Sequence, residues 1–228
     1  MEVYFSMLEV SILEINPELK QSDFDALLPF VAEDRQEKIN KFHFYKDARN
    51  CLLGDILARN EICRITGFKN NQLNFDNNKY GKPHLVSDAS IHFNISHAEN
   101  YVACAVSDEP VGIDIEINKS FDIKIAERFF MADEVLYIKN ADKATMAWRF
   151  YEVWIKKESR IKWEGKGLHM PLTSFSVFQC DEIPPVNYYE VFRNDEYICY
   201  LCTKKTIKPI TRIMNTTSVS AYLKMHIS

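Results

Sequence analysis

The stretch VGIDIEIN, residues 111–118, alternates apolar and polar residues along its whole length. A period of two predicts a half-buried strand, with the apolar residues at 111, 113, 115 and 117 on one side. The other side carries Asp114 and Glu116, which such a strand places side by side at roughly 7 Å. Like charges repel at that separation, and aspartate is a poor strand former. These two acids therefore need an explanation.

The same patterns predict the order of elements along the chain. A first strand at 3–15 is followed by a helix within 18–31 and a long helical segment over 33–67 that ends at Gly67. Strands at 91–95 and 101–106 flank a loop at 96–100, and helices follow the strand at 111–118, over 122–139 and 144–163. Further strands are predicted at 174–178, 187–192 and 197–203, before a less regular tail.

Strand, helices and strands thus occur twice in succession. This order predicts an α+β protein made of two similar halves, residues 1–108 and 109–228, each a small antiparallel sheet packed with helices. A duplication of one fold about a pseudo-twofold axis is the simplest explanation of that order.

Composition narrows the function classes. The 228 residues have a formal net charge of −4, which disfavours a nucleic-acid partner. No apolar run reaches the roughly 20 residues of a membrane helix, and the first residues lack the basic region of a signal peptide. The six cysteines lie in apolar surroundings, as reduced core cysteines do, and the pair Cys199 and Cys202 has no second pair nearby. We therefore expect a cytoplasmic protein whose cysteines are structural.

Two readings of the acids remain open at this point. Asp114 and Glu116 fit a solvent-facing strand surface, and they also fit a Mg²⁺ site, because the cation neutralises close carboxylates. Glu158 and Lys162 are spaced i, i+4 on the second long helix, which fits an ordinary surface ion pair. Glu158 also fits the role of a third ligand of the Mg²⁺ ion, with Lys162 beside it. Phosphate-binding loops of the P-loop and dinucleotide types, the G-x-S-x-G elbow and H-E-x-x-H are all absent from the sequence.

Several motifs taken together resemble one family, the 4′-phosphopantetheinyl transferases. They are GKP at 81–83, FNISH at 93–97, VGIDIE at 111–116 and WIKKESRIKWEGKGL at 154–168, with RQEKINKF at 35–42, DARNCLLGD at 47–55 and the helix region 128–134 in support. The resemblance covers almost the whole chain to about residue 178 and is to the larger, pseudo-dimeric type that activates surfactin-like peptide synthetases. It implies an active site at the interface of the two halves.

The resemblance also implies a reaction. The family transfers the phosphopantetheine arm of coenzyme A to a serine of an apo acyl or peptidyl carrier protein and releases adenosine 3′,5′-bisphosphate. Asp114, Glu116 and Glu158 would hold Mg²⁺, with Mn²⁺ as an alternative ion. Glu158 is our choice of general base, and Lys162 would neutralise or protonate the leaving phosphate. Residues at the family's coenzyme A positions are Arg35, Lys38, Arg49, Lys82, Ser96 and His97.

The carrier protein supplies the attacking serine, and a helix of it would dock on an apolar edge formed by Phe121, Ile123, Ile125, Phe129 and Phe130. One chain would hold both halves of the site, which predicts a monomer without nucleic-acid or membrane partners. Peptide, polyketide, siderophore and fatty-acid synthesis all remain open as the pathway served. Ala98 and Arg160 depart from the family's usual residues. The alternatives are a Mg²⁺-dependent phosphohydrolase acting on coenzyme A-like pyrophosphates and a non-catalytic relative that only binds carrier proteins.

Overall fold

The computed structural model describes residues 7–16, 19–178 and 185–215. Cys180 and the end of the predicted tail lie outside the described residues. Among the helices of the described part, none is both long and apolar enough to cross a bilayer.

The first half begins with one strand, continues with three helices and closes with four strands. Its elements are β1 (Leu8–Glu14), α1 (Gln21–Leu27), α2 (Glu33–Asn40), α3 (Tyr45–Thr66), β2 (Phe75–Asn77), β3 (Pro83–Leu85), β4 (His92–Ala98) and β5 (Tyr101–Ser107). The helix α3 carries most of the apolar contact with the sheet, and it ends at Gly67, whose φ of 75° is the left-handed conformation that the sequence predicts for a helix end.

The second half repeats the order with β6 (Val111–Ile117), α4 (Ile123–Phe129), α5 (Ala132–Lys139), α6 (Met146–Glu164), β7 (Asn187–Arg193) and β8 (Tyr197–Thr203). The last described strand is β9 (Ile210–Asn215). Two sheets result, ordered β4-β5-β1-β9 and β6-β8-β7, and a small β2-β3 hairpin lies beside the first. The prediction of two α+β halves with small sheets packed against helices is confirmed.

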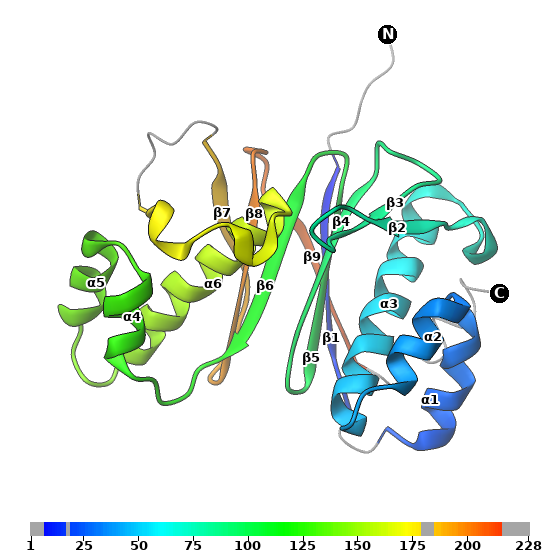
Figure 1. Cartoon of the computed structure of the whole chain (residues 1–228), viewed down its shortest axis with the longest axis horizontal. Helices are drawn as coiled ribbons and strands as arrows, with labels where there is room; N and C mark the ends of the chain where they lie inside the picture. Colours follow the sequence, from blue (N-terminus) through cyan, green and yellow to red (C-terminus); the bar gives the residue numbers. More distant parts are fainter. Residues whose placement is uncertain (1–6, 17–18, 179–184, 216–228) are drawn as a thin grey trace, which may run out of the picture.

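The two sheets occupy the middle of the molecule, and helices cover the outer side of each (Figure 1). Their inward faces share one apolar core, to which β6 contributes Val111, Ile113 and Ile115. The predicted alternation of β6 is therefore confirmed, with its apolar side between the sheets. Its other side faces α6, so the polar residues of VGIDIEIN point into the second half and not into bulk solvent.

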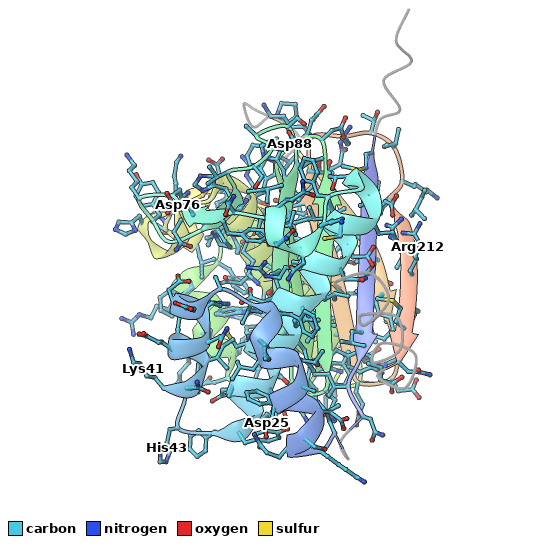
Figure 2. The ribbon with its side chains drawn as sticks, turned by 90° about the vertical axis from the view of Figure 1, so that its right-hand side faces the viewer. Asp25, Lys41, His43, Asp76, Asp88 and Arg212 are labelled. Carbon is cyan, nitrogen blue, oxygen red and sulfur yellow. The ribbon has the colours of Figure 1, made fainter. Side chains whose placement is uncertain are left out.

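The strand β9 crosses back to the first half. It pairs in parallel with β1, although it follows β8 in the chain. Arg212 of β9 (Figure 2) and Arg64 of α3 both form ion pairs with Glu9 of β1. A division of the chain at residue 108 did not anticipate this strand, because a pairing between distant segments has no local signal in the sequence.

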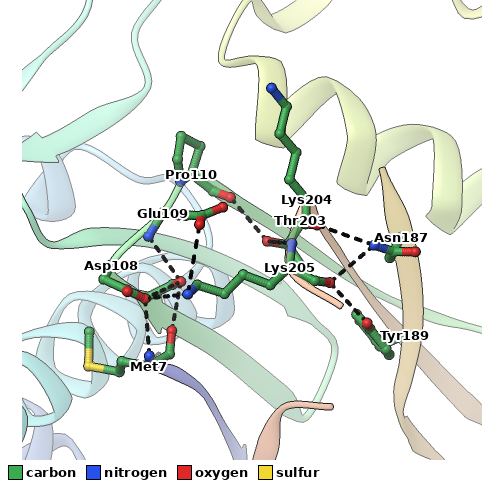
Figure 3. Close-up of polar contacts among 10 residues, drawn as sticks. Met7, Asp108, Glu109, Pro110, Asn187, Tyr189, Thr203, Lys204 and Lys205 are labelled. Atoms are coloured by element: carbon green, nitrogen blue, oxygen red, sulfur yellow. Dashed lines mark hydrogen bonds and ion pairs between the residues drawn. The ribbon is translucent and has the colours of Figure 1, made fainter. Parts of the chain in front are cut away.

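The connection between the halves is held by side chains from both. Lys205, which follows β8, lies 2.7 Å from Asp108 and 3.9 Å from Glu109 (Figure 3). Asp108 also accepts a hydrogen bond from the Met7 amide at 3.1 Å. The ion pair and the hydrogen bond tie the connection to the end of β8 and to the start of the first half.

Two predicted helices are each broken in two. The segment 33–67 is interrupted at 41–44, where Phe44 is extended with φ −102° and ψ 131°. Its neighbours there are aromatic residues and histidine, which are weak helix formers. The segment 122–139 is interrupted at Phe130 and Met131, where Glu134 accepts a hydrogen bond from the Met131 amide at 2.7 Å and so caps a new helix, α5.

Two further predictions were wrong. Ser96 and His97 are part of β4, which runs on to Ala98, so the loop shrinks to a tight turn at Glu99 and Asn100. The residues 174–178 do not form a strand. Their segment crosses α6, and the Phe175 carbonyl accepts a hydrogen bond from Lys157 instead of a strand partner.

A close approach of α6 to β6 explains the glycine in VGID. A Cβ atom on Gly112 would lie 2.0 Å from the Ser159 carbonyl oxygen and 2.3 Å from the Trp163 nitrogen. Both are backbone atoms of α6, so no side-chain rotation could relieve the clash.

We therefore expect Gly112→Ala to lower the free energy of unfolding by about 3 kcal/mol, the upper part of the range for overpacked cores. Urea unfolding measures this loss. Gly54→Ala is the matched control, because its Cβ would meet side-chain atoms rather than backbone, Ile95 Cγ2 at 2.9 Å and Val102 Cγ1 at 3.8 Å, and alanine favours the helix. Equal losses in the two variants would contradict this explanation.

Candidate active site

The two sheets meet along the edge strands β4 and β6. Side chains of the first half bind three backbone groups on the outward edge of β6, and among the described strands β6 pairs with β8. Asn94 accepts a hydrogen bond from the Ile113 amide at 2.8 Å, and Ser96 accepts one from the Ile115 amide at 3.4 Å. Both acceptors are buried. The junction of the two halves is thus polar, ordered and adjacent to Asp114.

Asp114 is 5% exposed, which rules out a solvent-facing surface for this acid. Its Oδ1 accepts hydrogen bonds from the Ser96 hydroxyl at 2.8 Å and from the Lys162 ammonium at 2.7 Å. Lys162 therefore pairs with Asp114 across the sheet–helix contact. Its predicted partner within the helix was Glu158. The second oxygen, Oδ2, is buried and accepts no hydrogen bond from the residues that the structure describes.

Two more carboxyl groups share this environment, Glu116 on β6 and Glu158 on α6. Burial raises the pKa of Glu116 to about 7, and the Asp114 charge adds to the effect, while Lys162 opposes it. The pKa of Glu158 is raised by the same causes in the same order. We call Asp114, Glu116 and Glu158 the acid cluster. Its members repel one another, and one lysine neutralises them only in part.

In the part of the chain that the structure describes, no three His, Cys, Asp or Glu side chains are gathered into a ready-made metal site. The acid cluster nevertheless fits a divalent cation. The orphaned Oδ2 of Asp114 lacks the positive partner that a buried carboxylate oxygen needs. Burial and the Asp114 charge raise the pKa values of the other two acids, so a bound cation would stabilise their ionised forms. Hard oxygen ligands of this kind suit Mg²⁺ or Mn²⁺.

This environment predicts the titration of Glu116. In the metal-free protein we expect its carboxyl to titrate with a pKa of about 7, and Mg²⁺ should lower that value. Because the folded-state pKa lies above 4.5, the folded protein binds more protons, so its stability falls as the pH rises from 4.5 to about 7. Carboxyl NMR measures the titration. Asp142, whose pKa is lowered by hydrogen bonds from Thr145, is the internal control that Mg²⁺ should not move. A Glu116 signal that titrates near 4.5 would contradict the prediction.

A cavity of about 460 Å³ opens in the first half, between α2, α3, the β2-β3 hairpin and β4. Basic side chains on its wall are Arg35, Lys38 and Arg59, and His97 also lines it. Arg35 forms an ion pair with Asp55, another wall residue. The pKa of His97 is lowered by partial loss of hydration and by the nearby Lys162 ammonium. Asp34, Asp55 and Asp76 also line the cavity, so it is a polar site of mixed charge, and it shares β4 with the acid cluster.

The residues predicted to contact coenzyme A fall into three groups. Arg35, Lys38 and His97 line the cavity. Ser96 and Lys82 turn to the junction of the halves, where Lys82 donates hydrogen bonds to the Val111 carbonyl at 3.0 Å and the Trp163 carbonyl at 3.4 Å. Arg49 bonds to the side chain of Asn50 and the carbonyl of Glu99, next to the β4–β5 turn.

The predicted docking edge is partly buried. Ile125 and Phe129 are 37% and 38% exposed, so they are available to a partner. Phe130 belongs to the core of the second half, and Phe121 stacks on Phe150 with ring centroids 4.3 Å apart. Of the five residues predicted for this edge, Ile125 and Phe129 alone are large exposed apolar side chains.

Sequence reasoning missed three features. Asn94 was quoted within FNISH but given no role, although a polar residue two positions before Ser96 lies on the same strand face. Arg59 lines the cavity from α3, where it looked like an ordinary helix residue. Lys157 forms a fully buried ion pair with Glu134 at 2.8 Å, which the sequence signals only by a lysine on the buried side of α6.

The two departures from the family pattern are both buried. Ala98 contributes to the core between the sheets, where a hydroxyl would find few partners. Arg160 places its guanidinium over the rings of Trp163 and Phe175, at 4.8 and 5.9 Å. Arg160 therefore acts inside the second half rather than on its surface.

Two family models match successive parts of the chain. Residues 16–109 match the family described as 4′-phosphopantetheinyl transferase, N-terminal, and residues 110–212 match the 4′-phosphopantetheinyl transferase superfamily. The chain is 34% identical to 4′-phosphopantetheinyl transferase gsp of Aneurinibacillus migulanus over 206 residues, 86% of each protein. It is 40% identical to 4′-phosphopantetheinyl transferase Sfp of Bacillus subtilis over 159 residues, 70% of this chain and 71% of that protein. A similarity of 27% over 166 residues extends to 4′-phosphopantetheinyl transferase HetI of a Nostoc species.

Proposed function

This chain belongs to the 4′-phosphopantetheinyl transferase family, and we propose that it transfers the phosphopantetheine arm of coenzyme A to a serine of an apo carrier protein in a Mg²⁺-dependent reaction. It is an enzyme of the transferase class. The further parts of the proposal are the metal, the by-product adenosine 3′,5′-bisphosphate, and the residues that bind and react.

One observation carries the proposal. The acid cluster and the cavity that holds Arg35, Lys38 and His97 both adjoin one strand, β4, at the junction of the halves. A coenzyme with phosphates at both ends of its nucleotide needs such a pair of sites. The cavity would take the 3′-phosphate and adenine through Arg35, Lys38 and His97. The pyrophosphate would then lie against Asp114, Glu116 and Glu158, with the metal between the acids and the phosphates.

The reaction forms a bond between the serine oxygen of the carrier and the β-phosphorus of coenzyme A, and it breaks the bond from that phosphorus to the bridging oxygen. A metal held by the acid cluster would supply the positive charge that stabilises the pyrophosphate oxygens in the transition state. Glu158 takes the serine proton, directly or through water, because its raised pKa makes it a better base than an ordinary glutamate. Lys162, 2.7 Å from Asp114, is placed to neutralise the leaving phosphate.

The roles of the halves follow from these sites. We assign coenzyme binding to residues 1–108, and the acid cluster, α6 and carrier docking to residues 109–228. The exposed Ile125 and Phe129 would contact the carrier, and the nearby Lys119 and Lys124 would attract its acidic surface. Since one chain supplies both halves, the proposal includes a monomeric enzyme acting in the cytoplasm.

The test is incubation with coenzyme A, Mg²⁺ and an apo carrier domain, followed by mass spectrometry of the carrier. A mass gain of one phosphopantetheine, lost in EDTA, is the expected result. Release of adenosine 3′,5′-bisphosphate without any gain on peptidyl or acyl carriers would favour a phosphohydrolase. Tight carrier binding with neither product would indicate a relative that only binds.

A further inference from the structure

Three side chains of the first half bind consecutive outward positions on the edge of β6. Lys82 binds the carbonyl of Val111, Asn94 the amide of Ile113, and Ser96 the amide of Ile115, at 3.0, 2.8 and 3.4 Å. These β6 residues are two positions apart, which is the spacing of groups on one edge of a strand. The opposite edge of β6 is paired with β8.

We propose that Lys82, Asn94 and Ser96, here called the side-chain ladder, are positioning residues that take the place of a neighbouring strand and fix β6 against β4. The proposal rests on the proposed function for its catalytic consequence. It reassigns Lys82 and Ser96, which the family resemblance places in contact with coenzyme A.

Burial supports this assignment. The Ser96 and Asn94 side chains are each 6% exposed, and an edge strand left without partners in that environment would carry unsatisfied backbone groups. Lys82 is half-buried, and its two hydrogen-bond acceptors are backbone carbonyls. Of the three ladder residues, Asn94 also lines the cavity, whereas Lys82 and Ser96 do not, although Gly81, Pro83 and His97 beside them do.

The ladder reaches the acid cluster at two points. The Ser96 hydroxyl donates to Oδ1 of Asp114 and accepts from Lys162, so it fixes which oxygen of that carboxylate stays free. Lys82 donates to the Trp163 carbonyl in the last turn of α6, the helix that carries Glu158. Asn78 of the same turn as Lys82 donates to the Gly165 carbonyl at 2.9 Å. The ladder therefore fixes the positions of β6 and α6 relative to the first half, where the coenzyme would bind.

Two affinities of the metal-free protein distinguish positioning from coenzyme contact. For Ser96→Ala we expect the Kd of Mn²⁺, measured by titration with the metal alone, to rise on the order of tenfold, as for other residues that orient a metal ligand. The Kd of adenosine 3′,5′-bisphosphate, measured in EDTA, should stay near the wild-type value. Ser96→Thr, which keeps the hydroxyl, should restore the Mn²⁺ affinity.

Lys38→Met is the matched variant for a cavity contact and should raise the Kd of adenosine 3′,5′-bisphosphate. Ser107→Ala removes a buried strand hydroxyl that donates to the Met7 carbonyl and accepts from the Glu109 amide; it does not line the cavity, and the variant should change neither affinity. If Ser96→Ala behaves like Lys38→Met, the residue is a coenzyme contact and the proposal is overturned. The proposal is also overturned if Ser96→Ala leaves the Mn²⁺ affinity unchanged.

Amide exchange tests the ladder without any ligand. Asn94→Ala should speed exchange of the Ile113 amide roughly tenfold, because it removes that group's acceptor. The Asp114 amide, which points to β8, should not change. Unchanged Ile113 exchange would overturn the ladder. A wild-type protein that binds no Mn²⁺ but shows this exchange pattern would leave the ladder standing and contradict the metal-dependent function.

Discussion

Replacing Glu158 by glutamine is expected to reduce the rate of carrier modification by at least about 10³-fold, within the range that general acid–base catalysis contributes. The substitution keeps the shape of the side chain but removes both the proton acceptor and one of the three charges of the acid cluster. A rate measured with saturating coenzyme A, Mg²⁺ and apo carrier, by mass spectrometry over time, checks the loss.

Stability separates this effect from a folding defect. Burial and the Asp114 charge already disfavour the ionised form of Glu158, so the neutral variant should unfold at the same temperature or higher in the absence of metal. Glu164→Gln is the control on the same helix, because that glutamate pairs with Arg160 at 3.4 Å and with Lys166 at 3.1 Å, away from the cluster. Glu158→Gln with an undiminished rate would remove this residue from both the base and the ligand roles.

The second large effect concerns the ion pair inside the second half. Lys157 and Glu134 are both fully buried and lie 2.8 Å apart. Lys157 also donates to the carbonyls of Leu172 at 2.7 Å and Phe175 at 2.6 Å, and Glu134 accepts from the amide of Val177 at 2.8 Å. The pair thus joins α5, α6 and the segment 172–178 from the back of the helix that presents Glu158.

We expect Lys157→Met to lower the free energy of unfolding by about 3–5 kcal/mol, because it leaves the Glu134 charge buried without its partner. Urea unfolding monitored by tryptophan fluorescence measures the loss. Lys156→Met is the adjacent control. Its ion pair with Glu152 lies nearer the surface, at 14% and 20% side-chain exposure, and should be worth about 1 kcal/mol or less.

A double variant tests the cause. Lys157→Met combined with Glu134→Leu removes both charges and should recover the part of the loss that comes from the unpaired charge. The carbonyls of Leu172 and Phe175 and the amides of Met131 and Val177 still lose their partners, so recovery is partial. A double variant as unstable as Lys157→Met alone would show that the loss comes from packing rather than from the unpaired charge.

Local patterns determined much of this protein. Alternation along 111–118 predicted β6 and which side of it is apolar, and helical periodicity with Gly67 and Gly165 as left-handed ends located α3 and α6. The motifs of the strand 111–118 and of α6 identified the acids and the family, because the spacing of chemically demanding residues is visible in one dimension. Helix breaks at 41–44 and at Phe130 were missed, since these depend on packing and on a cap by Glu134 rather than on periodicity.

Only the tertiary structure decided what the polar residues bind. The sequence paired Lys162 with Glu158 on one helix, whereas the fold brings it to Asp114, 48 residues away. It also brings Ser96 and Lys82, predicted as coenzyme A contacts, to the edge of β6, and returns β9 to the first sheet beside β1. The physical reason is common to all of these. Side-chain spacing within an element follows from backbone geometry, but a partner on another element is chosen by burial and by backbone groups left unpaired, and those exist only once the halves have met.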